Sequence, residues 1–312
     1  MEMLRKELET VLEQNQILQN EPMDRHTTFR VGGPADLYLL PTEEQLKNVM
    51  NILTDHRIHM TVIGNGSNLL VGDKGIRGAV IEIGNAMAEI TAEEDLVIAK
   101  AGALLSRTAQ TAYQHGLSGL EFAAGIPGSV GGAVVMNAGA YGGEMKDVVE
   151  YVKVLGRDGA VLKLTNEEME FSYRNSCAAI REYIVLEAAF RLKKSDPQTI
   201  LQRMEELKGQ RRMKQPLEYP SAGSTFKRPA PADGRPVYAA ALIDQCGLKG
   251  LAVGGAQVSE KHAGFVINRG GASCRDILEL IAQVRERVFR ETGITLEPEV
   301  RCLGREGEGW NF

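Results

Sequence analysis

The sequence predicts a mixed α+β fold that contains more than one domain. Segments with short apolar runs typical of buried strands alternate with segments whose apolar residues recur at helical spacing. Two glycine-rich loops, at residues 64–68 and 125–132, interrupt this alternation, and the charged stretch 193–195 resembles a linker. At roughly 100–200 residues per domain, the 312 residues suffice for two or three domains, so we expect a boundary near residue 195.

The N-terminal part predicts a helix followed by a β-α-β unit. Apolar residues recur at helical spacing over residues 1–18, at Leu4, Leu8, Val11, Leu12 and Leu18. A buried strand at 37–40 comes next, and Thr42 with Gln45 forms a capping box that opens a helix reaching about Asp55. The strand at 61–63 leads directly into the first glycine-rich loop.

The rest of the chain continues the alternation. We expect strands at residues 80–83, 96–99, 152–155, 161–164, 184–192 and 265–267, and helices at 106–115, 196–214 and 277–293. The pair Asp158-Gly159 is the strongest short hairpin signal in the chain. Pro197 at a first helical position and Gly293 after a last helical turn mark helix ends.

Composition excludes several classes of protein. The net charge is −5, so a nucleic-acid partner is not expected. No run of about 18 apolar residues is present, and the N-terminus lacks the apolar stretch of a signal peptide. The cysteines contain no C-x-x-C pair, and His56 with His59 lies at the end of a surface helix, where solvated histidines are the better interpretation, so no metal site is expected. We expect a cytoplasmic protein without a membrane partner; the oligomeric state stays open, and a monomer is compatible with the sequence.

The first glycine-rich loop has the composition of a phosphate-binding backbone nest. Its residues are Gly64, Asn65, Gly66, Ser67 and Asn68, and they follow a strand directly. Small residues that accept positive φ can present consecutive backbone N–H groups to phosphate oxygens. The loop is not a dinucleotide-binding Rossmann fingerprint, because Leu69 occupies the third glycine position. An ordinary hairpin loop remains the alternative.

The second glycine-rich loop contains few side chains over a long stretch. Its residues are Gly125, Ile126, Pro127, Gly128, Ser129, Val130, Gly131 and Gly132, and a second small-residue segment begins at Asn137. Such a stretch buries little side-chain area, so another group is expected to approach its backbone closely. That group is either a ligand, such as a flavin ring or its diphosphate, or a packed strand. Two such loops in one mixed domain favour a large phosphate-bearing cofactor.

Ser224 lies in the motif Gly223-Ser224-Thr225-Phe226-Lys227-Arg228. The G-x-S-x-G elbow of a nucleophilic serine is absent, because Gly223 directly precedes Ser224, and the histidines show no triad spacing. A proton donor is the better interpretation, with Lys227 and Arg228 placed for a phosphate or carboxylate.

Arg174 follows Tyr173 in a polar, aromatic turn and suits bidentate recognition of a carboxylate. Glu299 lies in the motif Glu297-Pro298-Glu299-Val300-Arg301. Spacing alone favours a surface ion pair between Arg174 and Glu299 over a catalytic pair.

Taken together and in this order, the motifs resemble the UDP-N-acetylenolpyruvoylglucosamine reductase (MurB) family. The resemblance covers residues 24–303, including the segment 26–35, both glycine-rich loops and the motifs of Arg174, Ser224 and Glu299. Each motif alone is weak, but the ordered set is specific. The resemblance implies an FAD-binding domain of the vanillyl-alcohol-oxidase (PCMH) type in two subdomains, 1–85 and 86–194, followed by an α/β substrate-binding domain at 195–305.

The resemblance also implies an activity, that of a UDP-N-acetylmuramate dehydrogenase. Such an enzyme contains FAD, uses NADPH, and reduces UDP-N-acetylglucosamine enolpyruvate to UDP-N-acetylmuramate for peptidoglycan synthesis. Ser224 matches the serine that protonates the enolpyruvyl C2, and Arg174 and Glu299 match the pair that activates the substrate. Both glycine-rich loops and Asn137 would bind FAD without a covalent link, since neither loop contains His or Cys. Tyr173, Lys227 and Arg228 would contact the UDP-sugar.

The chain departs from many family members in two places. Arg228 stands where many members have Asn, and residues 196–214 nearly fill the interval that elsewhere carries an extra segment with a substrate-covering tyrosine. The chain therefore resembles the shorter subclass. Two other functions stay open from the residues alone: an oxidase of the same superfamily, which has no need of Ser224 and Glu299, and a non-catalytic nucleotide-binding module.

Overall fold

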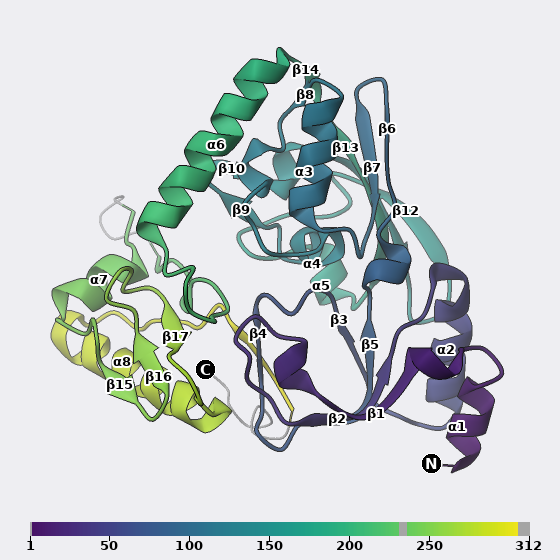
Figure 1. Ribbon diagram of the computed structural model, residues 1–312, viewed down its shortest axis with the longest axis horizontal. Helices are drawn as coiled ribbons and strands as arrows, with labels where there is room; N and C mark the ends of the chain where they lie inside the picture. Colours follow the sequence, from purple (N-terminus) through teal and green to yellow (C-terminus); the bar gives the residue numbers. More distant parts are fainter. Residues whose placement is uncertain (1, 231–235, 305–312) are drawn as a thin grey trace. The chain divides into compact units, whose positions relative to one another are not determined.

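The computed structural model describes residues 2–230 and 236–304 and divides into two compact units (Figure 1). Unit 1 contains residues 2–18, Tyr38–Asn65 and Ala79–Arg211, and unit 2 contains Gln19–Leu37, Gly66–Gly78 and the described residues from Arg212 onward. No helix in the part of the chain that the structure describes is long and apolar enough to cross a membrane.

These interleaved units differ from the three contiguous segments expected from the sequence. Three unit boundaries fall within the strands β1 (Ile17–Pro22), β2 (Pro34–Leu39) and β5 (Ile76–Glu82). These strands form a four-stranded sheet in the order β1-β2-β5-β3, in which β3 (Met60–Ile63) pairs parallel to β5. Each unit is thus built from several separate segments of the chain, so it cannot be described by one continuous range of residues. The division into two FAD subdomains and a substrate domain stays a prediction.

The main sheet of unit 1 has five antiparallel strands. Its order is β12-β11-β13-β7-β6, formed by Val161–Thr165, Val149–Leu155, Ile184–Arg191, Leu96–Lys100 and Ile90–Glu93. The helices α3 (Leu105–Gln114) and α4 (Val130–Val135) pack against this sheet. The expected hairpin at Asp158-Gly159 joins β11 to β12, and Gly159 has a φ of +75°. The expected helix α2 (Glu43–Asp55) begins with the capping box of Thr42 and Gln45.

Unit 1 also contains short elements around this sheet. They are α1 (Glu2–Leu8), α5 (Cys177–Ile180), α6 (Pro197–Lys214), β8 (Leu117–Ser118), β9 (Gly139–Ala140), β10 (Gly143–Glu144) and β14 (Lys193–Lys194), with 3-10 turns at Gln14–Gln16, Asn85–Met87, Glu121–Ala123 and Met145–Asp147.

The structure corrects two sequence-based expectations in unit 1. The first helix ends at Leu8 instead of residue 18, because the chain turns before the next strand: Gln14–Gln16 forms a separate 3-10 turn, and the Leu40 N–H donates to the Gln16 carbonyl at 3.0 Å. The Gln16 side chain also donates to the Leu40 carbonyl at 2.8 Å. The expected linker at Lys193–Lys194 is the strand β14, which pairs with β8. Residues 197–211 of the helix α6 belong to unit 1, and Ile200, Met204 and Leu207 on this helix are buried.

Unit 2 places a long helix against a small sheet. The strands β15 (Ala252–Val253), β16 (Ala256–Val258) and β17 (Val266–Asn268) are antiparallel, and α8 (Cys274–Thr292) packs on them (Figure 1). The helix α7 (Ala239–Gln245) contacts α8, and the 3-10 turn Met23–Arg25 completes the unit. As expected, Gly293 ends α8 in the left-handed conformation.

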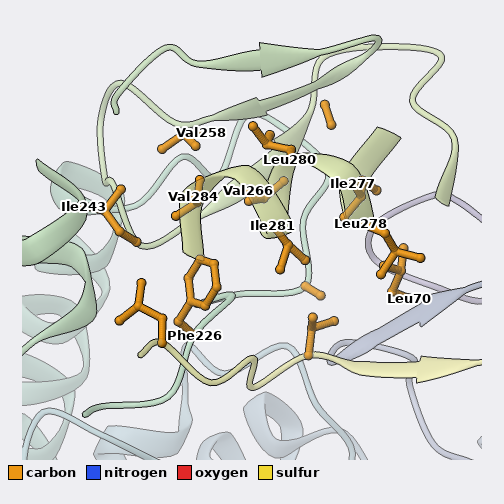
Figure 2. Packing of buried hydrophobic residues seen from close by; sticks show 14 of the residues in the cluster. Leu70, Phe226, Ile243, Val258, Val266, Ile277, Leu278, Leu280, Ile281 and Val284 are labelled. Carbon is orange, nitrogen blue, oxygen red and sulfur yellow. The ribbon is translucent and has the colours of Figure 1, made fainter. Parts of the chain in front are cut away.

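The core of unit 2 joins its distant chain segments. Figure 2 shows Leu70 and Phe226 in one cluster with Ile277, Ile281 and Val284 of α8. Leu70 comes from β4 (Leu69–Val71), which pairs parallel with β18 (Arg301–Leu303). Because β4 directly follows the first glycine-rich loop, this core fixes the end of that loop.

Candidate active site

The first half of the first glycine-rich loop is attached to the second glycine-rich loop within unit 1. The Asn65 side-chain amide donates to the Pro127 carbonyl at 2.6 Å. A Cβ on Gly64 would overlap the Ser129 hydroxyl. The two loops that the sequence predicted to share a ligand therefore lie together. Because Gly64 has no side chain, the Ser129 hydroxyl can lie directly against its backbone.

The second half of this loop is attached within unit 2. Gly66 has a φ of +62°, and a Cβ there would overlap the His26 carbonyl oxygen, so only glycine fits. The Asn68 side chain donates to the Glu299 carbonyl at 3.0 Å, and its own carbonyl accepts from the Arg301 N–H at 2.9 Å. The end of the predicted phosphate loop is thus bonded to the backbone of a predicted catalytic residue.

Ser129 carries an unsatisfied buried hydroxyl in this loop pair. The residue is 3% exposed, and its Oγ has no hydrogen-bond partner among the residues that the structure describes. It stands at the N-cap of α4 but makes no capping hydrogen bond. Leaving a buried hydroxyl unpaired costs about 1–3 kcal/mol. A phosphate oxygen of a bound cofactor would accept this hydrogen bond, so the residues fit the diphosphate of the expected FAD.

Arg211 is a candidate residue that the sequence analysis did not select. It lies on α6, where a Cβ on Gly125 would be 3.2 Å from its Cδ and 3.8 Å from its Nη1. The side chain is half-buried, and burial lowers the pKa of its guanidinium. Within residues 2–230 and 236–304 it has no ion-pair partner, so an anion bound at this loop would offset the cost of its burial. In the sequence, only the basic cluster at residues 208–214 could have pointed to Arg211. Most such clusters are solvated helix faces, so the cluster was not interpreted as a binding site.

The Arg174 side chain is presented by a two-residue turn in unit 1. Ser172 and Asn175 exchange backbone hydrogen bonds of 3.0 and 3.2 Å, which leaves Tyr173 and Arg174 at the tip. Arg174 has a φ of 56°, a left-handed conformation that is uncommon for a residue other than glycine. Its guanidinium lies 5.0 Å from the centre of the Tyr173 ring, in cation–π contact. The turn thus displays a stacked, planar cation.

Asn137 connects the turn that carries Arg174 to the segment after α4. It is fully buried with a φ of 41°, and its side-chain amide donates to the Ser172 carbonyl at 3.1 Å and to Glu144 Oε2 at 2.7 Å. Its side-chain oxygen accepts from the Lys146 N–H at 3.0 Å. Both amide hydrogens and the oxygen are therefore engaged inside the protein. The structure gives Asn137 a bracing role for the Arg174 turn, and its contact with a cofactor stays a prediction.

Ser224 and Glu299 are brought together in unit 2. The segment after Ser224 pairs antiparallel with the Glu299 motif through a bridge between Phe226 and Pro298. The Glu299 N–H donates to the Thr225 carbonyl at 2.8 Å. Ser224 is exposed and Glu299 is half-buried, whereas Phe226 lies in the core. Two residues far apart in sequence thus share one short backbone ladder.

The basic pair that follows Ser224 is arranged unequally. Lys227 forms an ion pair with Glu297, with 3.2 Å between Nζ and Oε2, and its N–H donates to the Glu297 carbonyl at 2.8 Å. The Arg228 guanidinium lies 5.2 Å from the centre of the Tyr238 ring. Both Arg228 and Tyr238 are exposed, so they form a flat, cationic surface next to the ladder. Tyr238 was not a candidate from sequence, since no local motif marks it.

Comparison with known proteins covers nearly the whole chain. One family model, described as an FAD binding domain, matches residues 34–165, and another, the C-terminal domain of UDP-N-acetylenolpyruvoylglucosamine reductase, matches residues 215–303. The UDP-N-acetylenolpyruvoylglucosamine reductase of Agathobacter rectalis is 52% identical over 300 residues, which are 92% of this chain and 94% of that protein. The protein of the same name from Caldanaerobacter subterraneus subsp. tengcongensis is 47% identical and covers 98% of this chain and 99% of its own length.

A solved structure is also similar over most of its length. The crystal structure of UDP-N-acetylenolpyruvylglucosamine reductase (MurB) from Thermus caldophilus has a TM-score of 0.77 at 39% identity, over 91% of this chain and 97% of that chain. These matches confirm the expected FAD-binding region followed by a separate C-terminal domain, in a mixed α and β fold.

Proposed function

The chain belongs to the UDP-N-acetylenolpyruvoylglucosamine reductase family, and on that premise we propose that it reduces UDP-N-acetylglucosamine enolpyruvate to UDP-N-acetylmuramate with FAD as cofactor and NADPH as reductant. The product is a peptidoglycan precursor. The observation that carries the proposal is that the segment directly after Ser224 pairs with the Glu299 segment. The Asn68 side chain, at the end of the first glycine-rich loop, also donates to the Glu299 carbonyl.

The cofactor site of this proposal is the pair of glycine-rich loops. FAD, when bound, supplies hydride transfer between NADPH and the enolpyruvyl double bond. The Ser129 hydroxyl and the backbone around Gly64 would hold the FAD diphosphate, because a side chain at Gly64 would overlap that hydroxyl and the hydroxyl lacks a partner among the described residues. Arg211, beside Gly125, adds a positive charge at the same loop.

Arg174 stabilises the charge that develops on the substrate. Adding a hydride to the enolpyruvyl group sends negative charge into its carboxylate. A planar guanidinium binds both carboxylate oxygens, and its stacking on Tyr173 limits its orientations before the reaction begins. Preorganised electrostatics of this kind is often the largest single contribution to catalysis.

Ser224 and Glu299 handle protons in this proposal. The exposed Ser224 hydroxyl donates a proton to C2 of the intermediate. Serine is a weak acid, but the intermediate is a strong base, so this proton transfer is feasible. Glu299 in its protonated form donates a hydrogen bond to the substrate carboxylate. The shared ladder fixes the spacing of these two side chains, because the Glu299 N–H is bonded to the residue after Ser224.

Lys227, Arg228 and Tyr173 are the proposed contacts with the UDP-sugar. Arg228 is exposed, and its contact with the Tyr238 ring holds the guanidinium at the surface, where a diphosphate can reach it. Since the substrate is a soluble nucleotide sugar, we propose that the enzyme acts in the cytoplasm and needs neither a nucleic-acid nor a membrane partner.

Flavin spectroscopy tests the proposal. The purified protein should be yellow, acid or heat should release its flavin, and anaerobic NADPH should bleach it. Adding the enolpyruvyl substrate should then restore the oxidised spectrum and yield a saturated product by mass spectrometry. A colourless protein would favour a nucleotide-binding module, and reduction by a simple alcohol with reoxidation by oxygen would favour an oxidase.

A matched pair of glycine variants tests the cofactor site itself. Gly64→Ala places a methyl group on the Ser129 hydroxyl, so the variant should lose FAD affinity while remaining folded by circular dichroism. Gly209→Ala, on α6, meets nothing within 4 Å and should retain FAD. Equal FAD affinity in the two variants would place the diphosphate elsewhere.

A further inference from the structure

His262 is a half-buried imidazole in unit 2 to which the proposed mechanism gives no role. Its Nδ1 accepts the Gly264 N–H at 3.1 Å, so the neutral ring carries its proton on Nε2. The ring meets Phe265 edge to face, with 4.9 Å between ring centres and an interplanar angle of 71°. A Cβ on Gly264 would lie 3.1 Å from His262 Cε1 and 3.2 Å from the Ala240 Cβ, so this loop is closely packed.

The residue that His262 fixes is bonded in turn to the Ser224 segment. The Gly264 carbonyl accepts the Thr225 N–H at 2.8 Å. The Thr225 hydroxyl accepts the Val266 N–H at 2.9 Å, and Thr225 is 2% exposed. Thr225 is therefore held from three sides, since its carbonyl also accepts the Glu299 N–H. Because Thr225 directly follows Ser224, its position sets the direction of the Ser224 side chain.

We propose that His262 is a positioning residue for Ser224: by accepting the Gly264 N–H it fixes the Gly264 carbonyl, which holds Thr225 and thereby aims the Ser224 hydroxyl. The inference rests on the proton-donor role proposed for Ser224. Glycine has the greatest backbone freedom of any residue, so the Gly264 carbonyl needs such a tether to keep one direction. A displacement of about 1 Å at a reacting group can cost roughly 10²-fold in rate, so a small rotation here has a measurable effect.

The environment of His262 keeps it in the accepting form. Burial lowers the pKa of the imidazole, and the positive charge of Lys249 lowers it further. Lys261, which directly precedes His262, forms an ion pair with Glu218, with 3.5 Å between Nζ and Oε2. A protonated ring would direct an N–H at the Gly264 N–H, which breaks the tether.

Three substitutions of His262 distinguish the role of its hydrogen-bond acceptor from the role of its aromatic ring. His262→Asn places a side-chain oxygen near the position of Nδ1, and His262→Gln moves that oxygen toward the position of Nε2. His262→Phe keeps the aromatic contact with Phe265 but has no acceptor. The measurements are anaerobic single-turnover rates for flavin reduction by NADPH and for reoxidation by the enolpyruvyl substrate, with Lys261→Gln as the control at the neighbouring exposed residue.

We expect reduction by NADPH to stay near the wild-type rate in all four variants. Reoxidation should be about 10-fold or more slower in the Phe and Gln variants, near normal in the Asn variant, and unchanged in Lys261→Gln. In a Ser224→Ala background, His262→Phe should cause no further loss, because the two residues act as one unit.

Several results would overturn the proposal. They are wild-type reoxidation in the Phe variant, a loss in the Asn variant as large as in the Phe variant, an equal slowing of both half-reactions, or an additive loss in the Ser224→Ala background. If the Phe variant does not fold, the Gln variant decides in its place. Failure of the proposed function would differ from all of these, since the wild-type protein itself would then not be reoxidised by the enolpyruvyl substrate.

Discussion

The turn that carries Arg174 in unit 1 and the ladder that carries Ser224 and Glu299 in unit 2 are held in different ways. The turn has a two-residue tip whose base is held by a buried side chain, that of Asn137. The ladder is held by backbone hydrogen bonds between the Ser224 and Glu299 segments, and Phe226 anchors it in the core of unit 2.

This difference predicts how each region tolerates substitution. Backbone hydrogen bonds can be made by almost any residue, so the ladder should keep its shape when the side chains that face solvent are changed. The Arg174 turn depends on one amide that makes three hydrogen bonds, and its tip holds a left-handed residue. Changes to the solvent-facing side chains of the ladder should therefore remove catalytic groups without disturbing the structure, whereas a change to the side chain that holds the Arg174 turn should alter the structure and thereby the catalysis.

Ser224→Ala should have the largest effect on chemistry and nearly none on folding. Reoxidation of the reduced flavin by substrate should fall by roughly 10²–10⁴-fold, as when a general acid is lost, while reduction by NADPH is unchanged. Ser221→Ala, in the same segment, is the matched control. Rapid-reaction absorbance of the flavin gives both rates, and wild-type reoxidation in Ser224→Ala would remove the residue from the mechanism.

Arg174→Lys should have the next largest effect on the chemistry. Lysine keeps the charge but loses the planar fork, so the barrier to reoxidation should rise by about 2–4 kcal/mol, or about 30- to 1,000-fold in rate. Flavin reduction by NADPH should proceed normally. Arg181→Lys is the control, since Arg181 forms a surface ion pair with Glu170 away from the Arg174 turn tip. An equal loss in both half-reactions would show that Arg174 has no specific role in the enolpyruvyl step.

Asn137→Ala tests whether the turn relies on its brace. Removing the amide takes away the acceptor of the Lys146 N–H and one of the two donors to the Ser172 carbonyl, which should lower stability by about 1–3 kcal/mol and also slow reoxidation. Asn166→Ala is the matched control, because the Asn166 amide donates to the carbonyls of Lys146 and Val149 away from the turn. It should lower the melting temperature but leave reoxidation unchanged, and the same kinetic loss in both variants would contradict the bracing role.

The smallest expected effect is a pH dependence of stability in unit 2. His262 has a lowered pKa in the folded protein, so between that value and the ordinary value of about 6.5 the unfolded chain binds more protons than the folded one. The stability that the neutral imidazole contributes is complete above the unfolded pKa and is lost as the pH falls. The wild-type melting temperature should therefore drop more than that of His262→Asn between about pH 8 and about pH 5.5. Parallel curves for the two proteins would show that His262 titrates normally.

The sequence by itself determined the features that neighbouring residues encode. The capping box at Thr42 starts α2, Asp158-Gly159 makes the β11–β12 turn, and Gly293 ends α8, all as expected. These signals act within a few residues of one another, so their physics is contained in a short stretch of sequence. The ordered motifs likewise identified the family and the candidate site residues.

Only the tertiary structure decided features that depend on a distant partner. Beyond the first helix, Gln16 is bonded to the distant Leu40 instead of continuing the expected helix, and the pairing of β14 with β8 turned the expected linker into a strand. Arg211 became a site candidate through its contact with Gly125, and Asn137 became a brace through its bond to Ser172. In each case a long-range hydrogen bond or packing contact outweighs a local preference, because local propensities are worth only a fraction of the free energy that tertiary burial supplies.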